Sequence, residues 1–232
     1  MKNIWIGLIL LMFVTDCKSQ NNMKVVYVYD ALCGWCYGFS PVMSQFQEKH
    51  KDSLAFEVVS GGMITGNRIG PIGEVASYIS WAYKDVEKAT NVKFGNDFLN
   101  KTLKDGNAVF TSIPTAIALS VFKKIQQENS VAFASALQKA IYYDGIEPEN
   151  YAAYGNIAAE FGLDSTDFVL QMKDTINVQN AANDFKKSND LGVTGFPTVF
   201  IEVDGVYHKI ASGYVPFNVL ENSFLTIKNK LK

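Results

Sequence analysis

A stretch that joins a buried strand to a helix through two cysteines constrains the fold more than any other part of the chain. Residues 24–29 are β-branched and aromatic, as in a buried strand. Residues from about 39 to 51 alternate apolar and polar side chains at helical spacing, with Pro41 expected in the first turn. Cys33 and Cys36 lie between these segments. The cysteines are therefore expected where a strand ends and a helix begins.

This placement favours thiol chemistry. The first turn of a helix carries unpaired N–H groups and the positive end of the macrodipole, so a thiolate there is stabilised and its pKa falls below the roughly 8.5 of a free cysteine. We expect Cys33 to be the exposed, attacking sulfur, and Cys36, one turn later, to close the disulfide. Gly34 and Trp35 carry no charge, so the stabilisation must come from helix N–H groups.

The cysteine pair allows two other interpretations. A structural zinc site needs four ligands, and the remaining candidates, Cys17, His50 and His208, do not have ligand spacing. We therefore expect no metal. A redox-inert structural disulfide is the other alternative, but the strand-to-helix context favours a thioredoxin-like redox site.

The first residues are typical of an export signal. A single early lysine and an apolar run over residues 4–14 predict a signal peptide within residues 1–19, too short to span a membrane. Cys17 follows a sequence similar to a lipoprotein processing box, although Asp16 replaces the usual small residue. We expect either cleavage before Cys17 with lipid attachment to it, or cleavage near Ser19. The mature protein would then lie in the periplasm or cell envelope, where disulfide chemistry proceeds.

Composition excludes some partners. The 232 residues carry a formal net charge of −2, without the basic excess typical of nucleic-acid binding. No later apolar run is long enough for a membrane span. The length of the mature chain suits one domain with a large insertion.

A second strand is predicted over residues 54–59, followed by a glycine-rich segment, residues 61–73. Its spacing matches no phosphate-binding fingerprint, so we expect a loop near the cysteines. Arg68, the charge in this loop, either touches substrate or is solvated. From Glu74 to about residue 190 the pattern is helical, with helices over residues 114–127, 131–142, 151–161 and 178–191. The aromatic residues here either line a groove or fill the core: Tyr78, Trp81, Tyr83, Tyr142, Tyr143, Tyr151 and Tyr154.

The last part of the chain is predicted as a hairpin and a helix. A strand over residues 199–203 is joined by Asp204-Gly205, a hairpin turn signal, to a strand over residues 206–210. A helix over residues 215–231 follows. The order predicts an α/β, thioredoxin-like fold made of a βαβ and a ββα unit with a mixed sheet. Residues 23–66 and 178–232 would form this domain, and residues 67–177 an inserted all-helical subdomain.

Two motifs carry a specific resemblance to a known protein family. The runs Asp-Ala-Leu-Cys-Gly-Trp-Cys-Tyr (residues 30–37) and Thr-Gly-Phe-Pro-Thr (residues 194–198) are similar to those of the DsbA family of thioredoxin-fold proteins, in its FrnE-like branch. Weaker matches are residues 60–63 and 157–164. The resemblance covers about residues 23–232 and implies the helical insertion.

The resemblance also implies site residues. It implies a cis Phe196–Pro197 bond beside Cys33, where a bound peptide can pair with the backbone; a trans proline that opens the strand is the alternative. Substrate binding would involve Gly34, Trp35, Thr194, Gly195, Phe196 and Pro197. Tyr27 stands where thioredoxin and DsbA have a buried acid. Asp30, the nearest carboxylate, is either a loop or helix-start residue or a proton relay for Cys36.

We therefore expect a thiol–disulfide oxidoreductase that acts on protein or peptide thiols and disulfides. Cys33 attacks and Cys36 resolves, without metal or organic cofactor. A thiol pool such as glutathione, or a membrane redox partner, would recycle the pair. The alternatives are a glutathione-using transferase or isomerase of the kappa type, and a non-redox binding or holdase protein in the envelope.

Overall fold

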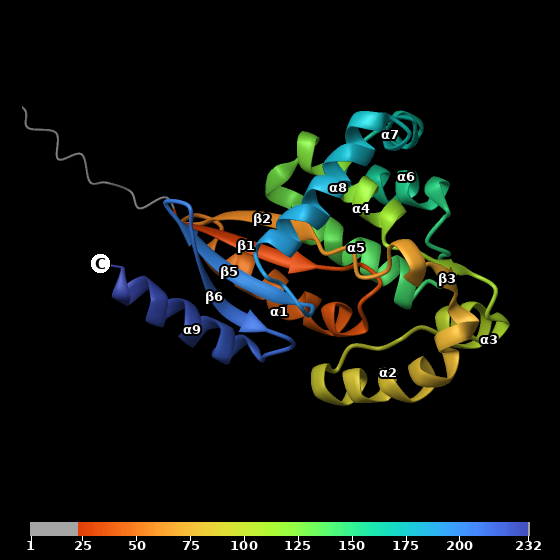
Figure 1. The fold of residues 1–232 in the computed structure, drawn as a ribbon, viewed down its shortest axis with the longest axis horizontal. Helices are drawn as coiled ribbons and strands as arrows, with labels where there is room; N and C mark the ends of the chain where they lie inside the picture. Colours follow the sequence, from red (N-terminus) through yellow and green to blue (C-terminus); the bar gives the residue numbers. More distant parts are fainter. Residues whose placement is uncertain (1–22, 232) are drawn as a thin grey trace, which may run out of the picture.

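The computed structural model describes residues 23–231. The export signal predicted within residues 1–19 and the lipidation proposed at Cys17 lie outside this range. A four-stranded sheet forms the centre of the fold (Figure 1). Its strands, in the spatial order β2-β1-β5-β6, are β1 (Met23–Tyr29), β2 (Ala55–Ser60), β5 (Thr198–Val203) and β6 (Val206–Ser212).

Strand pairing confirms the predicted mixed sheet. Strands β1 and β2 are parallel, as their helical crossover requires, whereas β5 is antiparallel to both β1 and β6. Asp204 and Gly205 join β5 to β6 with positive φ angles of 51° and 81°, which is the geometry of a type I′ hairpin turn. The α/β thioredoxin-like fold class is therefore confirmed.

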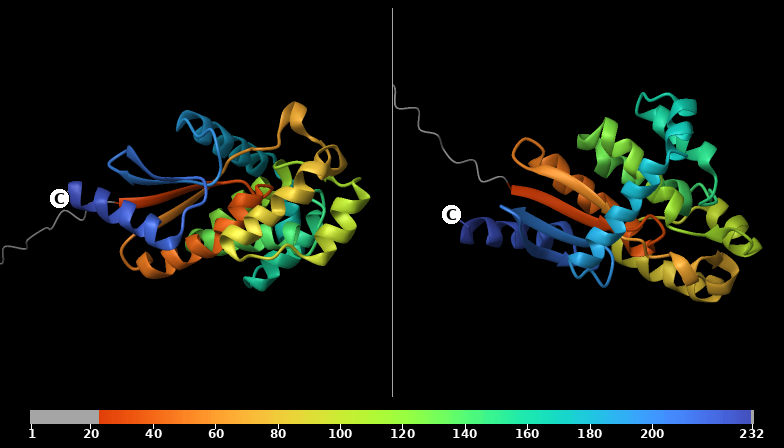
Figure 2. Two further views of the ribbon diagram at one scale, coloured as in Figure 1. Left: turned by 90° about the horizontal axis from the view of Figure 1, so that it is seen from below. Right: turned by 45° about the horizontal axis from the view of Figure 1, so that its top comes forward.

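Side chains alternate between the two faces of the sheet. Val25, Tyr27 and Tyr29 of β1 pack in the main core with helix α1 (Gly34–His50) and helix α9 (Phe217–Lys230). Val26 and Val28 point the other way, into a small core beside the end of helix α8 (Thr175–Asp190). Figure 2 shows α8 on one side of the sheet and α1 and α9 on the other. Both faces of β1 are buried, which explains its continuous apolar sequence.

The segment between β2 and β5 is mainly helical, as predicted. Its α-helices, besides α8, are α2 (Ala76–Thr90), α3 (Leu103–Asp105), α4 (Ile113–Ile125), α5 (Ser130–Tyr142), α6 (Tyr151–Glu160) and α7 (Ser165–Met172). Short 3-10 turns span Gly66–Arg68, Ile72–Val75 and Gln127–Asn129. Helix α8 begins three residues before the predicted start because the Asp174 side chain accepts a hydrogen bond from the Ile176 N–H and caps it there. Helix α8 packs against both β2 and α4. The predicted division of the chain into a thioredoxin-like domain (residues 23–66 and 178–232) and an inserted helical subdomain (residues 67–177) therefore stays a proposal.

Helix α1 starts earlier than the sequence pattern indicated. It begins at Gly34 and not near Phe39, because the Cys33 side chain caps its first turn. Pro41 consequently lies inside the helix, and the expectation that it occupies the first turn is wrong. The first turn of α1 carries glycine and cysteine and packs on the site. The helical spacing of apolar residues therefore begins only after this turn.

Two features of the segment between β2 and α4 were not predicted. A two-residue strand β3 (Gly70–Pro71) pairs with β4 (Val109–Phe110), and a π-helical turn spans Phe98–Thr102. A two-residue strand is too short to show the alternation of apolar and polar side chains that marks a strand in the sequence, and its pairing depends on tertiary contact. A second core packs beneath α2, with Tyr37, Phe94 and Phe98 among its members. This core holds α2 close to the first turn of α1.

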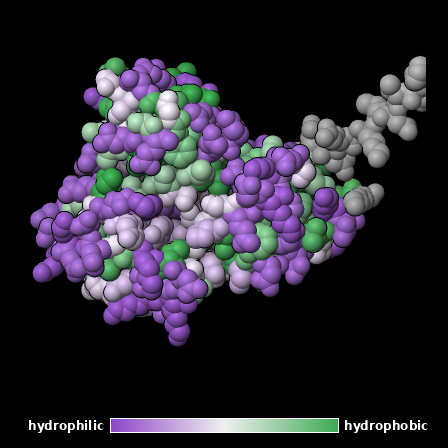
Figure 3. Space-filling view, turned by 180° about the vertical axis from the view of Figure 1, so that it is seen from behind, coloured by the Kyte–Doolittle hydropathy of each residue, from purple (hydrophilic) through white to green (hydrophobic). Residues whose placement is uncertain are grey.

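Figure 3 shows one face of the molecule, on which hydrophilic residues prevail and hydrophobic residues appear in small groups. Between residues 23 and 231 there is no helix with the length and apolar character needed to cross a bilayer.

Candidate active site

Cys33 occupies the N-cap of α1, directly after the loop that leaves β1. Its φ and ψ angles of −97° and 112° are extended, and its Sγ accepts a hydrogen bond from the backbone N–H of Cys36 at 3.4 Å. The sulfur therefore sits at the positive end of the helix, where an N–H group stabilises negative charge. This confirms the predicted placement of the two cysteines.

The exposure of Cys33 differs from the prediction. Cys33 keeps only 7% of its surface exposed, so the expectation that it is exposed is wrong, although it is less deeply buried than Cys36, which keeps none. Cys33 lines a cavity together with Met63, Trp35 and residues of α2. Both cysteines are free thiols.

Cys36 lies in the core behind Cys33. Burial raises the pKa of the Cys36 thiol well above its ordinary value, and the hydrogen bond and charge of Cys33 add to this. Burial therefore favours the neutral thiol of Cys36 over its thiolate. This difference in burial suits Cys33 for attack and Cys36 for resolution.

The Phe196–Pro197 bond is cis, as the resemblance implied. The Cys33 thiol donates to the Phe196 carbonyl oxygen at 3.6 Å. Strand β5 brings this segment to the site because Thr198 pairs with Val28 near the end of β1. The Phe196 ring packs against Gly61, where an added Cβ would lie 2.1 Å from the ring. The expected proximity of the glycine-rich loop to the cysteines is confirmed at this contact.

Asp30 is a buried carboxylate that joins three segments. Its Oδ1 accepts hydrogen bonds from the Leu32 N–H at 3.0 Å and the Ser112 hydroxyl at 2.9 Å, and its Oδ2 accepts from the Met63 N–H at 2.8 Å. Burial raises the pKa of Asp30, although these hydrogen bonds oppose the shift. Asp30 also accepts a hydrogen bond from the Cys33 N–H through its carbonyl oxygen. Its role in ordering the loop is therefore visible, and a role as a proton relay stays a proposal.

The other predicted site residues differ in where they lie relative to the two cysteines. Gly34 and Trp35 form the first turn of α1, and the exposed Trp35 ring lies 6.2 Å from the Tyr214 ring. Thr194 and Gly195 are exposed in the loop before the cis bond. Arg68 is also exposed, and its guanidinium donates to the Gly62 carbonyl oxygen at 3.2 Å.

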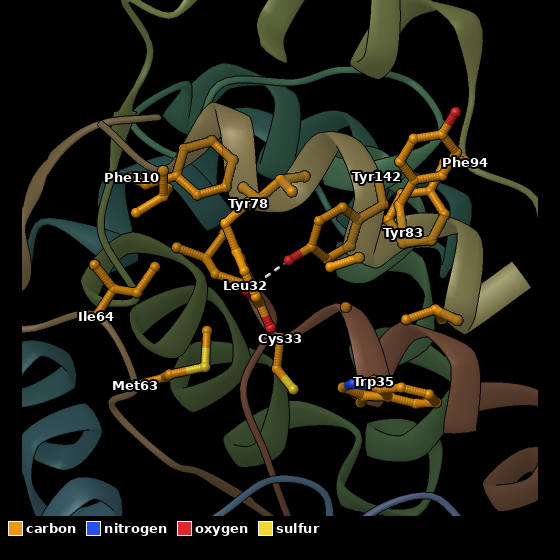
Figure 4. A pocket seen from close by; sticks show the side chains of 15 residues that line it. Leu32, Cys33, Trp35, Met63, Ile64, Tyr78, Tyr83, Phe94, Phe110 and Tyr142 are labelled. Carbon is orange, nitrogen blue, oxygen red and sulfur yellow. Dashed lines mark hydrogen bonds between the residues drawn. The ribbon is translucent and has the colours of Figure 1, made fainter. Parts of the chain in front are cut away.

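An apolar cavity of about 280 Å³ opens beside Cys33 (Figure 4). The cysteine loop, the segment after β2 and helix α2 contribute most of its lining. The lining side chains labelled in Figure 4 are Leu32, Cys33, Trp35, Met63, Ile64, Tyr78, Tyr83, Phe94, Phe110 and Tyr142. The sequence alone allows the aromatic residues of the helical segment either to line a groove or to fill the core. Tyr78, Tyr83 and Tyr142 line this cavity, and Tyr154 is fully buried.

No group of three or more His, Cys, Asp or Glu side chains suited to a metal ion occurs within residues 23–231. The arrangement is a dithiol site: one sulfur at a helix N-terminus and at the edge of a cleft, a second sulfur buried one turn later, and a backbone carbonyl beside the first.

Comparison with known proteins places this geometry in a family. The model of the DSBA-like thioredoxin domain matches residues 24–224. The chain therefore belongs to the DSBA-like thioredoxin domain family, whose members have a thioredoxin fold with a helical region. No curated protein matches the sequence.

Solved structures show the same architecture over most of the chain. A Nitrosomonas europaea protein, provisionally named a protein disulfide isomerase, has a TM-score of 0.78 and 21% identity, covering 90% of this chain and 98% of its own. The cytosolic disulfide reductase DsbM from Pseudomonas aeruginosa has a TM-score of 0.75 and 28% identity, covering 90% and 100%. The structure of DsbM with GSH has a TM-score of 0.70 and 25% identity, covering 90% of this chain and 98% of its own. A 2-hydroxychromene-2-carboxylate isomerase shares the fold with a TM-score of 0.63 and 12% identity, covering 89% of this chain and 97% of its own.

Proposed function

We propose that this protein is a thiol–disulfide oxidoreductase that acts on protein or peptide substrates through Cys33 and Cys36. The observation that carries the proposal is the Cys33 sulfur, capped by the Cys36 N–H at 3.4 Å and placed 3.6 Å from the Phe196 carbonyl oxygen. Family membership and the likeness to a disulfide reductase at 28% identity support it. Placement in the FrnE-like branch stays a prediction from the sequence.

The proposed reaction uses two exchange steps. The Cys33 thiolate attacks one sulfur of a substrate disulfide, forming a mixed disulfide and releasing the other sulfur as a thiolate that takes up a proton. Cys36 then loses its proton and attacks the Cys33 sulfur, which releases the second substrate thiol. The substrate disulfide is thereby reduced to two thiols while Cys33 and Cys36 form a disulfide. The reverse sequence oxidises a substrate dithiol.

Substrate contact is proposed for the residues around Cys33. Phe196 and Pro197 would present backbone to the peptide, with Thr194 and Gly195 at the edge of this contact. Gly34 and Trp35 would border the peptide on the side of α1. Asp30 is proposed as a loop-ordering residue and, as the alternative, as a proton relay for Cys36, on whose pKa its charge acts.

The oxidised or reduced pair must be recycled. A thiol pool such as glutathione is the first candidate, since DsbM has been solved with GSH; a membrane redox partner is the alternative. We propose an exported protein, anchored by lipid through Cys17 or released by cleavage near Ser19. Fractionation of cells that produce the tagged full-length protein tests this location, and a soluble cytoplasmic pool alone would contradict it.

Replacement of one cysteine at a time tests the mechanism. With Cys36→Ser, a disulfide-bonded peptide should accumulate as a mixed disulfide on Cys33, visible by mass spectrometry and reversed by dithiothreitol. With Cys33→Ser, no such adduct should form on Cys36, because Cys36 is fully buried. A glutathione-using transferase or isomerase would keep its activity in Cys36→Ser. A non-redox binding protein would keep full function with both cysteines replaced, and would form no adduct in either variant.

A further inference from the structure

Two side chains of helix α5 donate hydrogen bonds to the loop that carries Cys33. The Tyr142 hydroxyl donates to the Leu32 carbonyl oxygen at 2.5 Å. The Gln138 amide donates to the Asp30 carbonyl oxygen at 3.5 Å. Figure 4 shows the Tyr142 hydroxyl directed at Leu32, with a dashed line between them. The two donors are four residues apart on α5, so they lie on one face of the helix, one turn from each other.

The loop held by these donors is a tight turn that ends at Cys33. The Cys33 N–H donates to the Asp30 carbonyl oxygen at 3.1 Å, which closes a β-turn over four residues. The turn delivers Cys33 in the extended conformation of an N-cap residue, and this conformation lets its sulfur accept from the Cys36 N–H. The orientation of the reactive sulfur therefore depends on a turn that α5 holds from outside.

Burial makes the two carbonyl groups depend on these donors. Leu32 and Asp30 are buried, as are Gln138 and Tyr142. A buried carbonyl oxygen without a donor loses its hydration and gains nothing in exchange. The Leu32 carbonyl also belongs to the peptide bond that joins Leu32 to Cys33, so its oxygen places partial negative charge close to the cysteine. The Tyr142 hydroxyl offsets this charge, which a thiolate on Cys33 would otherwise face uncompensated.

Aromatic neighbours fix the Tyr142 ring in the position from which it donates. It stacks on the Tyr37 ring, with the ring centroids 5.5 Å apart. The Phe94 and Phe98 rings meet it edge to face, each at a centroid distance of 5.1 Å. These contacts leave the hydroxyl little freedom to turn away from the cysteine loop.

The titratable groups that face Cys33 come from β1, α5 and the cysteine region itself. Tyr27 of β1 and Tyr142 of α5 each have a pKa raised well above the ordinary value, mainly by burial, with the charge of Cys33 contributing. Asp30 of the loop and Cys36 of α1 are the others. Among the described residues that line the cavity at Cys33, none carries a charge. The Tyr142 hydroxyl therefore keeps its proton at neutral pH and acts as a donor.

We propose that Tyr142 and Gln138 are positioning residues for disulfide exchange, which hold the turn before Cys33 and offset the carbonyl charge beside its thiolate. The inference rests on the proposed function and adds two residues of the helical segment to it. Both residues act through the backbone of the turn. The consequence is that the Cys33 thiolate forms more readily, and the reduced pair is more stable, than the turn alone would allow.

Two measurements on the full-length protein test this role. The rate of alkylation of Cys33 by iodoacetamide is followed across pH, with the product located by tandem mass spectrometry. The redox equilibrium with glutathione is read by thiol trapping. In Tyr142→Phe, the midpoint of the alkylation profile should move to higher pH. The ratio of the squared concentration of glutathione to that of oxidised glutathione, at which half of the pair is oxidised, should rise about threefold, the effect of a modest neutral hydrogen bond.

Tyr37→Phe is the matched control. The Tyr37 hydroxyl donates to the Lys93 carbonyl oxygen at 2.9 Å, and the ring stacks on Tyr142. Burial and the charges of Asp144 and Glu87, rather than those of the cysteines, raise the pKa of Tyr37 to about 12. This variant loses a tyrosine hydrogen bond of the same kind from the same aromatic stack. Both readouts should stay as in the unmodified protein.

Gln138→Met removes the second donor and introduces no charge. It should move both readouts in the same direction as Tyr142→Phe and by less, about twofold, because its hydrogen bond is longer. Urea unfolding of each variant shows whether it folds. If Tyr142→Phe does not fold, Gln138→Met decides alone, and unchanged readouts in it overturn the proposal.

The outcomes separate a positioning role from a structural one. Shifts in Tyr142→Phe and Gln138→Met, with none in Tyr37→Phe, support the proposal. A structural role alone destabilises the reduced and the oxidised protein alike and leaves both readouts unchanged. That result, a shift in the opposite direction, or an equal shift in Tyr37→Phe overturns the proposal. If the unmodified protein shows no reversible exchange with glutathione, the proposed function fails, whereas the alkylation profile still decides whether α5 acts on Cys33.

Discussion

The Cys33 thiol donates a hydrogen bond to the Phe196 carbonyl oxygen across 3.6 Å, joining residues that are 163 positions apart in the chain. The contact exists because β5 pairs with β1 and carries Phe196 to the end of that strand. It places the Cys33 sulfur beside the backbone of the segment that holds the cis Phe196–Pro197 bond.

Gly61 sets the position of the Phe196 ring. An alanine Cβ at this position would lie 2.1 Å from the ring, so Gly61→Ala must displace Phe196. We expect a loss of about 1–3 kcal/mol in unfolding free energy and a fall of roughly tenfold or more in peptide reduction rate, because the carbonyl beside Cys33 moves with the ring. In the double variant with Phe196→Ala, the stability cost of Gly61→Ala should disappear. Independent, additive costs in this double-mutant cycle would contradict direct packing.

Asp30 holds the cysteine loop through acceptor oxygens only. In Asp30→Asn, an amide N–H₂ replaces one acceptor and leaves a buried donor such as the Met63 N–H unpaired. We expect a loss of about 1–3 kcal/mol in unfolding free energy, measured in urea. Asp164→Asn is the matched control: Asp164 caps α7 at the surface, where asparagine caps equally well.

The pH dependence of this variant follows from the direction of the pKa shift. Burial raises the pKa of Asp30 above its unfolded value, so its contribution to stability is complete below the unfolded pKa and declines as pH rises through the folded pKa. The destabilisation caused by Asp30→Asn should therefore be larger at acid pH than at neutral pH. A destabilisation that grows with pH would show that the folded state favours the ionised carboxylate.

Glu57 titrates in the opposite sense. Burial raises the pKa of this carboxyl, but hydrogen bonds from Lys187 and Lys24 outweigh it, so the pKa is lowered. Its stabilisation is present above the unfolded pKa and is lost as pH falls through the folded pKa. Glu57→Gln should cost about 1 kcal/mol at neutral pH, and the difference should vanish in acid. Glu48→Gln, which breaks an exposed pair with Lys51, should cost less at every pH.

Tyr27 carries a buried hydroxyl without a hydrogen-bond partner among the described residues. Removal of such a hydroxyl relieves a desolvation cost, so Tyr27→Phe should leave the unfolding free energy unchanged or raise it by up to about 1 kcal/mol. Tyr154→Phe removes a hydroxyl that donates to the Pro148 carbonyl oxygen at 2.7 Å, and should lower stability by about 1 kcal/mol. Equal losses in both variants would mean that the Tyr27 hydroxyl has a partner.

The sequence was sufficient for the parts of the fold that local patterns encode. The strand before Cys33, the hairpin at Asp204-Gly205 and the helices with apolar periodicity were predicted close to their bounds, because burial and turn chemistry mark them directly. The cis bond before Pro197 came from resemblance. Cys33 was expected to be exposed because local sequence does not reveal what packs around a helix N-terminus.

The contacts that complete the site depend on distant segments. Ser112 reaches Asp30 from 82 residues away and Met63 from 33, and neither has a local signature of that role. The pairing of β3 with β4 and the position of α2 over the cysteines are likewise tertiary. From the sequence, the aromatic residues of α2 could either line a groove or fill the core. Only the packing of α2 beside Cys33 showed that Tyr78 and Tyr83 line a cavity.

The most direct test of the central claim is the reduction potential of the Cys33/Cys36 pair in the full-length protein. Equilibration in glutathione buffers, with thiol trapping as the readout, should give a reversible two-electron transition that Cys36→Ser abolishes. A potential near the roughly −120 mV of DsbA would mean that the protein donates disulfides, and one near the roughly −270 mV of thioredoxin that it reduces them. The absence of any reversible transition would contradict the account and leave the site as a binding surface.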